Sequence, residues 1–188
     1  MAMPDLVERY WTAEDVRALP EDGTRYECVD GVLLVTPAPS GLHQRTCMAM
    51  LRTLDAFVAE HSLGELLYSP ADIELEPGTL VQPDLFVALG WPGNPPYEWH
   101  GIAGLLLAIE VLSPSTARRD RGIKREFYQR TGVEEYWIVD LDARLIERWT
   151  PSSARPEILR ETLRWAPAGA TEPLEIELPG LFAKILGA

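Results

Sequence analysis

The stretch from Leu105 to Leu112, LLLAIEVL, holds one carboxylate inside an otherwise continuous apolar run. A run of this length predicts a strand that is buried on both faces, as in the centre of a sheet between two layers. An ionised carboxylate in such a strand is costly unless it is paired or bound to a metal. Glu110 therefore restricts the chain to folds that supply a positive charge beside a central strand.

The patterns around this strand predict an α/β protein with a mixed sheet flanked by helices. Asp30-Gly31 between two β-like runs predicts an N-terminal β-hairpin. A strand, a helix and a second strand over 105–140 predict a crossover unit. Three more helices are expected: a short capped helix after Thr12, a long helix after Ser40 and a short helix at 180–186. Further strands are expected at 65–69, 71–77 and 81–89, in a hairpin around 141–142, and once or twice more in the tail. Residues 90–101 are expected to form a Pro/Gly loop.

The chain has 188 residues, of which 46% are hydrophobic, so it can bury one sizeable core, and we expect residues 1–188 to form a single domain. No apolar stretch is long enough for a membrane span, and the N-terminus lacks the layout of a signal peptide. These features predict a cytoplasmic protein with no membrane partner. Cys28 and Cys47 have neither metal nor disulfide spacing, so both are interpreted as small core residues.

The formal net charge of −12 disfavours a protein that coats nucleic acid through bulk charge. A local basic patch is still compatible with this composition. One helix is basic: residues 118–130 contain Arg118, Arg119, Arg121, Lys124, Arg125 and Arg130 against two acids. This helix directly follows the strand that carries Glu110.

A second carboxylate is expected beside Glu110. Strand side chains alternate between faces, so Leu106 and Ala108 should share the face of Glu110, and Asp84 should share a face with the other even-numbered residues of 82–88. If the two strands are neighbours, Asp84 and Glu110 lie side by side. Two such charges raise one pKa sharply or require a cation between them. Without a cation, removing one charge should leave stability unchanged or increase it. Oxygen ligands with an open face suit Mg²⁺ or Mn²⁺.

The helix supplies a candidate partner for these acids. Asp120, Lys124 and Tyr128 recur at intervals of four and so share one helical face, beside a core stripe of Ile123 and Phe127. Lys124 could therefore reach Glu110. A purely structural ion pair between Glu110 and Lys124 or Arg121 is an equally simple interpretation of the same residues.

The motifs Pro83-Asp84, IEVLSPST and DRGIKREFYQRTGVEEYWIVD resemble a bacterial family of putative restriction endonucleases in the PD-(D/E)xK nuclease superfamily. Together with RYECVDGVLL, HQR and the tail, the matching stretches span most of residues 10–186. The resemblance implies a restriction-endonuclease-like fold and metal-dependent hydrolysis of DNA. It departs from the superfamily pattern at Leu112, where the superfamily has its lysine, and the family's lysine corresponds to Lys124.

The resemblance also implies roles for individual residues. Asp84 and Glu110 correspond to the metal-binding acids, and the carbonyl of Val111 to an additional ligand for Mg²⁺ or Mn²⁺. Glu27 corresponds to the acidic residue in the family's N-terminal hairpin and His43 to the start of its first long helix; their roles are less defined, and we include both among the catalytic candidates. The candidate DNA contacts are the arginines of the basic helix, Arg118, Arg119, Arg121 and Arg125. Because one such site cuts one DNA strand, cleavage of both strands favours a homodimer with one site in each chain.

Two other functions fit the same residues. One is a catalytically silent module that binds nucleic acid or protein, which the net charge of −12 supports. The other is a metal-dependent hydrolase of a different phosphate ester.

Overall fold

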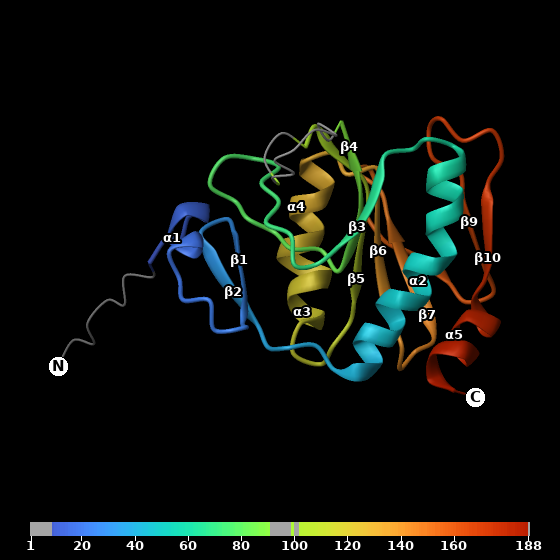
Figure 1. Cartoon of the computed structure of the whole chain (residues 1–188), viewed down its shortest axis with the longest axis horizontal. Coiled ribbons are helices and arrows are strands. Elements are labelled where there is room, and N and C mark those ends of the chain that lie inside the picture. Colours follow the sequence, from blue (N-terminus) through green and yellow to red (C-terminus); the bar gives the residue numbers. More distant parts are fainter. Residues whose placement is uncertain (1–8, 91–98, 100–101, 188) are drawn as a thin grey trace.

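A computed structural model describes residues 9–90, 99 and 102–187. Its centre is a six-stranded sheet with the order β3-β4-β5-β6-β7-β8 (Figure 1). The neighbouring strands β5 and β6 are parallel, and every other neighbouring pair in this sheet is antiparallel. The predicted mixed sheet is confirmed. Its strands are β3 (Glu65–Tyr68), β4 (Leu85–Leu89), β5 (Gly104–Val111), β6 (Glu135–Asp140), β7 (Leu145–Trp149) and β8 (Glu157–Leu159).

The crossover from β5 to β6 runs through α3 (Ala117–Arg119), a π-helical turn η1 (Asp120–Lys124) and α4 (Arg125–Arg130). The sequence predicted a helix here but not its π turn. The backbone leaves helical geometry at Gly122, with φ −109° and ψ −105°, where the missing side chain makes the distortion easier. The kinked segment carries the two buried charged residues Asp120 and Lys124.

One face of the sheet is covered by α2 (Gly41–Glu60), α5 (Leu178–Leu186) and a separate ribbon of β9 (Thr162–Trp165) and β10 (Leu174–Glu177) (Figure 1). Ser40 caps α2 by accepting a hydrogen bond from the His43 N–H, which fixes the helix start as predicted. The apolar stripe of α2 packs with β4, β5, β6 and α5 in one core. The tail thus contains three strands, β8 included, where one or two were predicted.

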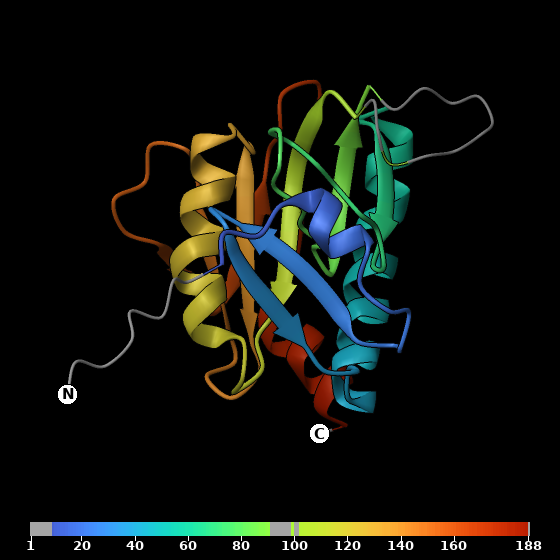
Figure 2. The same cartoon turned by 90° about the vertical axis from the view of Figure 1, so that its left-hand side faces the viewer.

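The opposite face carries α4 and the hairpin of β1 (Arg25–Val29) and β2 (Val32–Thr36), with the short helix α1 (Ala13–Arg17) beside it (Figure 2). The hairpin turns at Asp30 and Gly31, whose φ angles are 51° and 77°, as the predicted two-residue turn requires. Thr12 and Asp15 form the predicted capping box of α1. A second core lies between this layer and the sheet and includes Phe127.

Two details of the central strands differ from the expectation. A bulge in the pairing of β4 with β5 sets Val87 opposite Leu107 and Ala88 opposite Leu105, which leaves Leu106 unpaired. Leu106 therefore packs in the first core, and the prediction that it shares the face of Ala108 was wrong. In addition, β4 begins at Leu85, so Asp84 precedes the strand. The predicted loop at 90–101 falls mostly outside the described residues.

In the described part of the chain, no helix has both the length and the apolarity that crossing a membrane would require.

Candidate active site

The ends of β4 and β5 bring Asp84 and Glu110 together. Leu85 pairs with Ile109 in the antiparallel register, and continuing that register by one residue sets Asp84 across from Glu110. Both residues are only 3% exposed. The two strands are therefore neighbours, and the acids lie side by side, as the alternation of side chains predicted.

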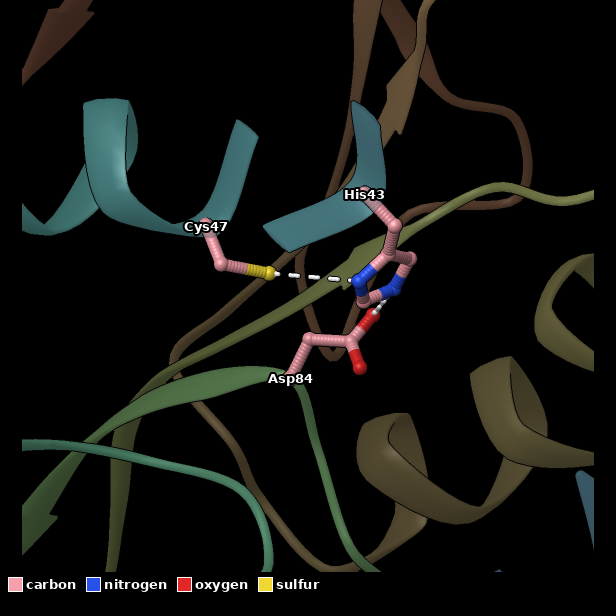
Figure 3. Close-up of side chains that lie close together, drawn as sticks. All are labelled: His43, Cys47 and Asp84. Atoms are coloured by element: carbon pink, nitrogen blue, oxygen red, sulfur yellow. Dashed lines mark hydrogen bonds and ion pairs between the residues drawn. The ribbon is translucent and has the colours of Figure 1, made fainter. Parts of the chain in front are cut away.

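Three donors hold the Asp84 carboxylate. Oδ1 accepts a hydrogen bond from Arg25 Nη1 at 2.9 Å, and Oδ2 accepts one from the Val111 N–H at 2.9 Å. His43 Nε2 also lies 2.9 Å from Oδ2 (Figure 3). Burial alone would raise the pKa of Asp84, but His43, Arg25 and the Val111 N–H more than offset it and lower the pKa to about 2.

The pKa of Glu110 is shifted in the opposite direction to that of Asp84. Its Oε1 contacts Lys124 Nζ and accepts a hydrogen bond from the Tyr128 hydroxyl at 3.3 Å. Burial raises the pKa of Glu110 well above its ordinary value, and the charge of Lys124 only partly counters this. The adjacent charge of Asp84 raises it further. Of the two neighbouring acids, one pKa is thus lowered and the other raised, as expected for like charges that share a site.

Lys124 joins the N-terminal hairpin to the central strand. Its Nζ lies 2.8 Å from Glu27 Oε1, the same oxygen that accepts a hydrogen bond from the Gln82 N–H at 2.7 Å. Burial would lower the pKa of Lys124, but Glu110 and Glu27 outweigh it and raise the pKa well above its ordinary value. The side chain is therefore a buried cation. The same π turn carries Asp120, where burial raises the pKa to about 6.

Asp84 and Glu110 face a cleft of about 510 Å³. Its walls are formed by the segment that leads into α2, the segment that follows β5, and the turn after β6. Arg25, His43 and Val111 also line it, whereas Glu27 and Lys124 are not among the lining residues and lie behind Glu110. Of the predicted catalytic and metal-binding residues, Asp84, Glu110, His43 and Val111 thus lie on the cleft wall, and Glu27 and Lys124 lie behind it.

Two sets of atoms could hold a metal ion here. The first is the all-oxygen set of the Asp84 and Glu110 carboxylates and the Val111 carbonyl, from residues that all line the cleft. Such hard oxygen donors fit Mg²⁺ or Mn²⁺. A bound cation would favour the charged form of Glu110, whose burial otherwise raises its pKa. The second set is His43, Cys47 and Asp84, whose ligand atoms lie within 4.8 Å of one another.

Sequence reasoning missed two members of the site. Arg25 lies two positions before Glu27 on β1, so both side chains leave the strand on the same side, and this spacing could have identified it. Cys47 follows His43 by one turn of α2, with its Sγ 3.6 Å from Nδ1. It is half-buried against the first core, as its interpretation as a core residue predicted, yet it also contacts the site. Cys28 is fully buried, as predicted.

Three of the four arginines proposed to contact DNA already bind within the protein. Arg119 donates to the Val35 carbonyl at 2.7 Å. Arg121 does not pair with Glu110 but binds two other acids, Asp140 and Glu147. Arg125 binds side chains of its own helix, Glu126 and Gln129. Arg121 lines the cleft, whereas Arg118 is exposed but is not among the cleft-lining residues.

Comparison with known proteins places this geometry in context. A family model described as Uma2, putative restriction endonuclease, matches residues 13–181. The fold is similar to the crystal structure of a putative nuclease belonging to DUF820 from Anabaena variabilis ATCC 29413, with a TM-score of 0.75. That match has 20% sequence identity and covers 93% of this chain and 98% of the other, so it supports the fold alone. No curated protein matches the chain.

Proposed function

We propose that this chain, which belongs to the Uma2 family of putative restriction endonucleases, hydrolyses phosphodiester bonds in DNA with the aid of Mg²⁺ or Mn²⁺. The observation that carries the proposal is the pair of buried acids Asp84 and Glu110, side by side on a cleft wall. Buried carboxylates with strongly shifted pKa values in a cleft are typical of functional sites.

Asp84, Glu110 and the carbonyl of Val111 would hold the ion. When bound, such a cation lowers the pKa of coordinated water and neutralises charge on the phosphoryl group. The Val111 N–H bond and the His43 contact fix the orientation of Asp84 beforehand, which reduces the entropy lost when ligands are ordered. His43 therefore has a positioning role in this proposal.

Lys124 acts as a cation rather than as a base, because its raised pKa keeps the ammonium protonated. It favours the charged form of Glu110, whose burial otherwise opposes ionisation. Its ammonium contacts two carboxylates and lies behind Glu110 rather than on the cleft wall, so in this proposal it acts on the reaction through Glu110. Glu27 holds the ammonium from the other side, which makes it a second positioning residue.

The substrate contacts follow from the rim of the cleft. Arg121 on the cleft wall and the exposed Arg118 are the proposed donors to the DNA backbone, and Arg119, Arg121 and Arg125 would each have to leave or share their present partners. Such contacts position a duplex but do not read its sequence. The proposal also takes residues 1–188 as one domain that works as a cytoplasmic homodimer, since one site cuts one strand.

A silent binding module is the second candidate. The specific observation in its favour is that the chain already supplies cations to both acids, through Arg25 at Asp84 and Lys124 at Glu110. Buried ion pairs of this kind also occur without any catalytic role.

The test is incubation of the purified protein with single-stranded, nicked and duplex DNA in Mg²⁺ or Mn²⁺, with and without chelator. Cleavage that chelator blocks and that Glu110→Gln abolishes is expected. An exposed acid on α2, Asp55, provides the matched control, because Asp55→Asn should cut normally. Binding without cleavage would favour the silent module. Turnover of small phosphodiesters without any effect on DNA would favour a hydrolase of another phosphate ester.

A further inference from the structure

The first turns of α2 present a nitrogen and a sulfur donor to the same acid that the proposed Mg²⁺ site uses. His43 and Cys47 lie four residues apart on one helical face; the Cys47 thiol points toward the His43 ring, and His43 points toward Asp84 just before β4 (Figure 3). The imidazole lies between the thiol and the carboxylate. One ligand atom from each residue can be chosen so that all three lie within 4.8 Å of one another.

The spacing of these atoms resembles that around a tetrahedral zinc ion. With Zn–S bonds near 2.3 Å and Zn–N bonds of about 2.0–2.1 Å, a tetrahedral angle separates sulfur from nitrogen by about 3.5 Å. Cys47 Sγ and His43 Nδ1 are 3.6 Å apart. The Asp84 oxygen is hydrogen-bonded to the other ring nitrogen, Nε2, so from a spacing of at most 4.8 Å the carboxylate has to approach by up to about 1.5 Å and give up that contact when the ion binds.

We propose that His43, Cys47 and Asp84 form a second metal site, selective for a soft divalent ion of the zinc class. Thiolate and imidazole donors favour such ions, whereas Mg²⁺ prefers oxygen ligands alone. Three protein ligands leave the fourth tetrahedral position open. Two of the three residues, His43 and Asp84, line the cleft, which gives an ion a route from solvent to the site.

The two metal sites share Asp84, so they cannot both be filled through that carboxylate. This part of the inference rests on the proposed function: zinc would remove a ligand from the Mg²⁺ or Mn²⁺ site and act as an inhibitor. The binding of zinc itself needs no nuclease activity, and it can be measured on protein that cuts nothing.

Cobalt(II) is the probe, because a thiolate ligand gives it a near-ultraviolet charge-transfer absorption. The wild type is expected to show this absorption on titration with Co²⁺ and to lose it when Zn²⁺ is added. Cys47→Ala should abolish the absorption, and His43→Gln should weaken Co²⁺ binding by at least about tenfold. The other cysteine is the control: Cys28 lies in a separate apolar cluster, so Cys28→Ala should keep the absorption.

Several outcomes would overturn the site. They are the absence of the absorption in folded wild type, its persistence in Cys47→Ala, or equal Co²⁺ affinity in His43→Gln. The fold of each variant is checked by circular dichroism, and where Cys28→Ala does not fold, the comparison of wild type with Cys47→Ala and His43→Gln decides.

Competition is measured separately by the electron paramagnetic resonance of free Mn²⁺. Zinc should release bound Mn²⁺ from the wild type at a much lower concentration than from Cys47→Ala, where it competes only through the remaining ligands. If Mn²⁺ never binds, the proposed function loses its metal while the Co²⁺ result stands. If zinc binds through Cys47 and leaves Mn²⁺ in place, the shared use of Asp84 is wrong.

Discussion

The ammonium group of Lys124 contacts the carboxylate of Glu110 where almost no solvent reaches either residue. The chain has two lysines, and the other, Lys184, is exposed on α5. A buried charge that keeps its partner is tolerated, whereas one that loses it is strongly destabilising. The pair therefore allows separate tests of structure and of chemistry.

We expect Lys124→Met to destabilise the fold by about 3–5 kcal/mol at neutral pH, because it leaves Glu27 and Glu110 buried without their cation. The pKa of Glu110 is already raised, and removal of Lys124 raises it further. An acid with a raised pKa opposes folding as pH rises through the interval between its unfolded and folded values. The loss should thus be smaller in mildly acid than in alkaline buffer.

Chemical denaturation at several pH values measures this loss. Lys184→Met is the control and should change stability by no more than about 0.5 kcal/mol. The double variant Lys124→Met with Glu110→Gln should recover part of the loss. A deficit that is the same at every pH would indicate lost packing rather than an unpaired carboxylate.

For Asp84 the effect of pH on stability runs in the opposite direction to that for Glu110. Its pKa is lowered from 3.8 to about 2, so its ionised form stabilises the fold above about 3.8, and this contribution disappears as pH falls through about 2. We expect Asp84→Asn to cost on the order of 2 kcal/mol at neutral pH without metal. The deficit relative to wild type should shrink below pH 3.8. Urea denaturation of both proteins across this range provides the measurement, and a pH-independent difference would contradict the argument.

That expectation corrects the one drawn from the sequence, which treated Asp84 and Glu110 as two charges that repel each other without a cation. The chain supplies two cations, Arg25 at Asp84 and Lys124 at Glu110. Alternation along two strands sufficed to predict that the acids meet. It could not predict their counter-ions fully, because Arg25 comes from a hairpin far away in the sequence whose placement depends on tertiary packing.

Other features of the fold were likewise predictable where they depend on neighbouring residues and not predictable where they depend on tertiary packing. Local patterns predicted the hairpin turn at Asp30-Gly31 and the helix cap at Ser40, since neighbouring residues determine both. The recognition motifs predicted the family correctly. The bulge at Leu106 and the π turn at Gly122 were not foreseen, because each depends on how two elements fit against one another. The proximity of Cys47 to the site depends on where α2 lies on the sheet.

Arg25 occupies one oxygen of Asp84, so it should compete with a metal ion. Its Nε is buried and has no hydrogen-bond partner within the described residues, a state that costs about 1–3 kcal/mol. We expect Arg25→Gln to raise Mn²⁺ affinity by about tenfold, or roughly 1.4 kcal/mol, as measured by calorimetry. Arg17, which pairs with Glu74 at the surface, is the control, because Arg17→Gln should not alter Mn²⁺ binding. Lower affinity in Arg25→Gln would mean that the guanidinium orders the acid instead of competing.

DNA binding should depend on salt with a slope set by few contacts. If Arg118 and Arg121 each meet one phosphate, log K falls against log salt with a slope of about −2, at about −0.9 per contact. Replacing both with alanine should make the slope approach zero. The control removes two exposed arginines that lie outside the basic segment 118–130, Arg52 and Arg155. Fluorescence anisotropy at several salt concentrations gives the slopes, and an unchanged slope in the first double variant would exclude this patch.

Metal binding should stabilise the fold through the same acids that the chain's cations now hold. By mass action, a Mn²⁺ concentration ~100 times its Kd adds about 2.7 kcal/mol, because the ion binds the folded state alone. Asp84→Asn and Glu110→Gln each remove a ligand charge and should lose most of this gain, whereas the exposed Asp55→Asn should retain it. Zinc separates the two metal sites in the same experiment: Cys47→Ala should lose the stabilisation by Zn²⁺ and keep that by Mn²⁺. Thermal melts of these variants with chelator and with each ion test the prediction. If the wild type melts at the same temperature with chelator and with excess Mn²⁺, the ion pairs at Asp84 and Glu110 are structural, and the proposed mechanism loses its metal.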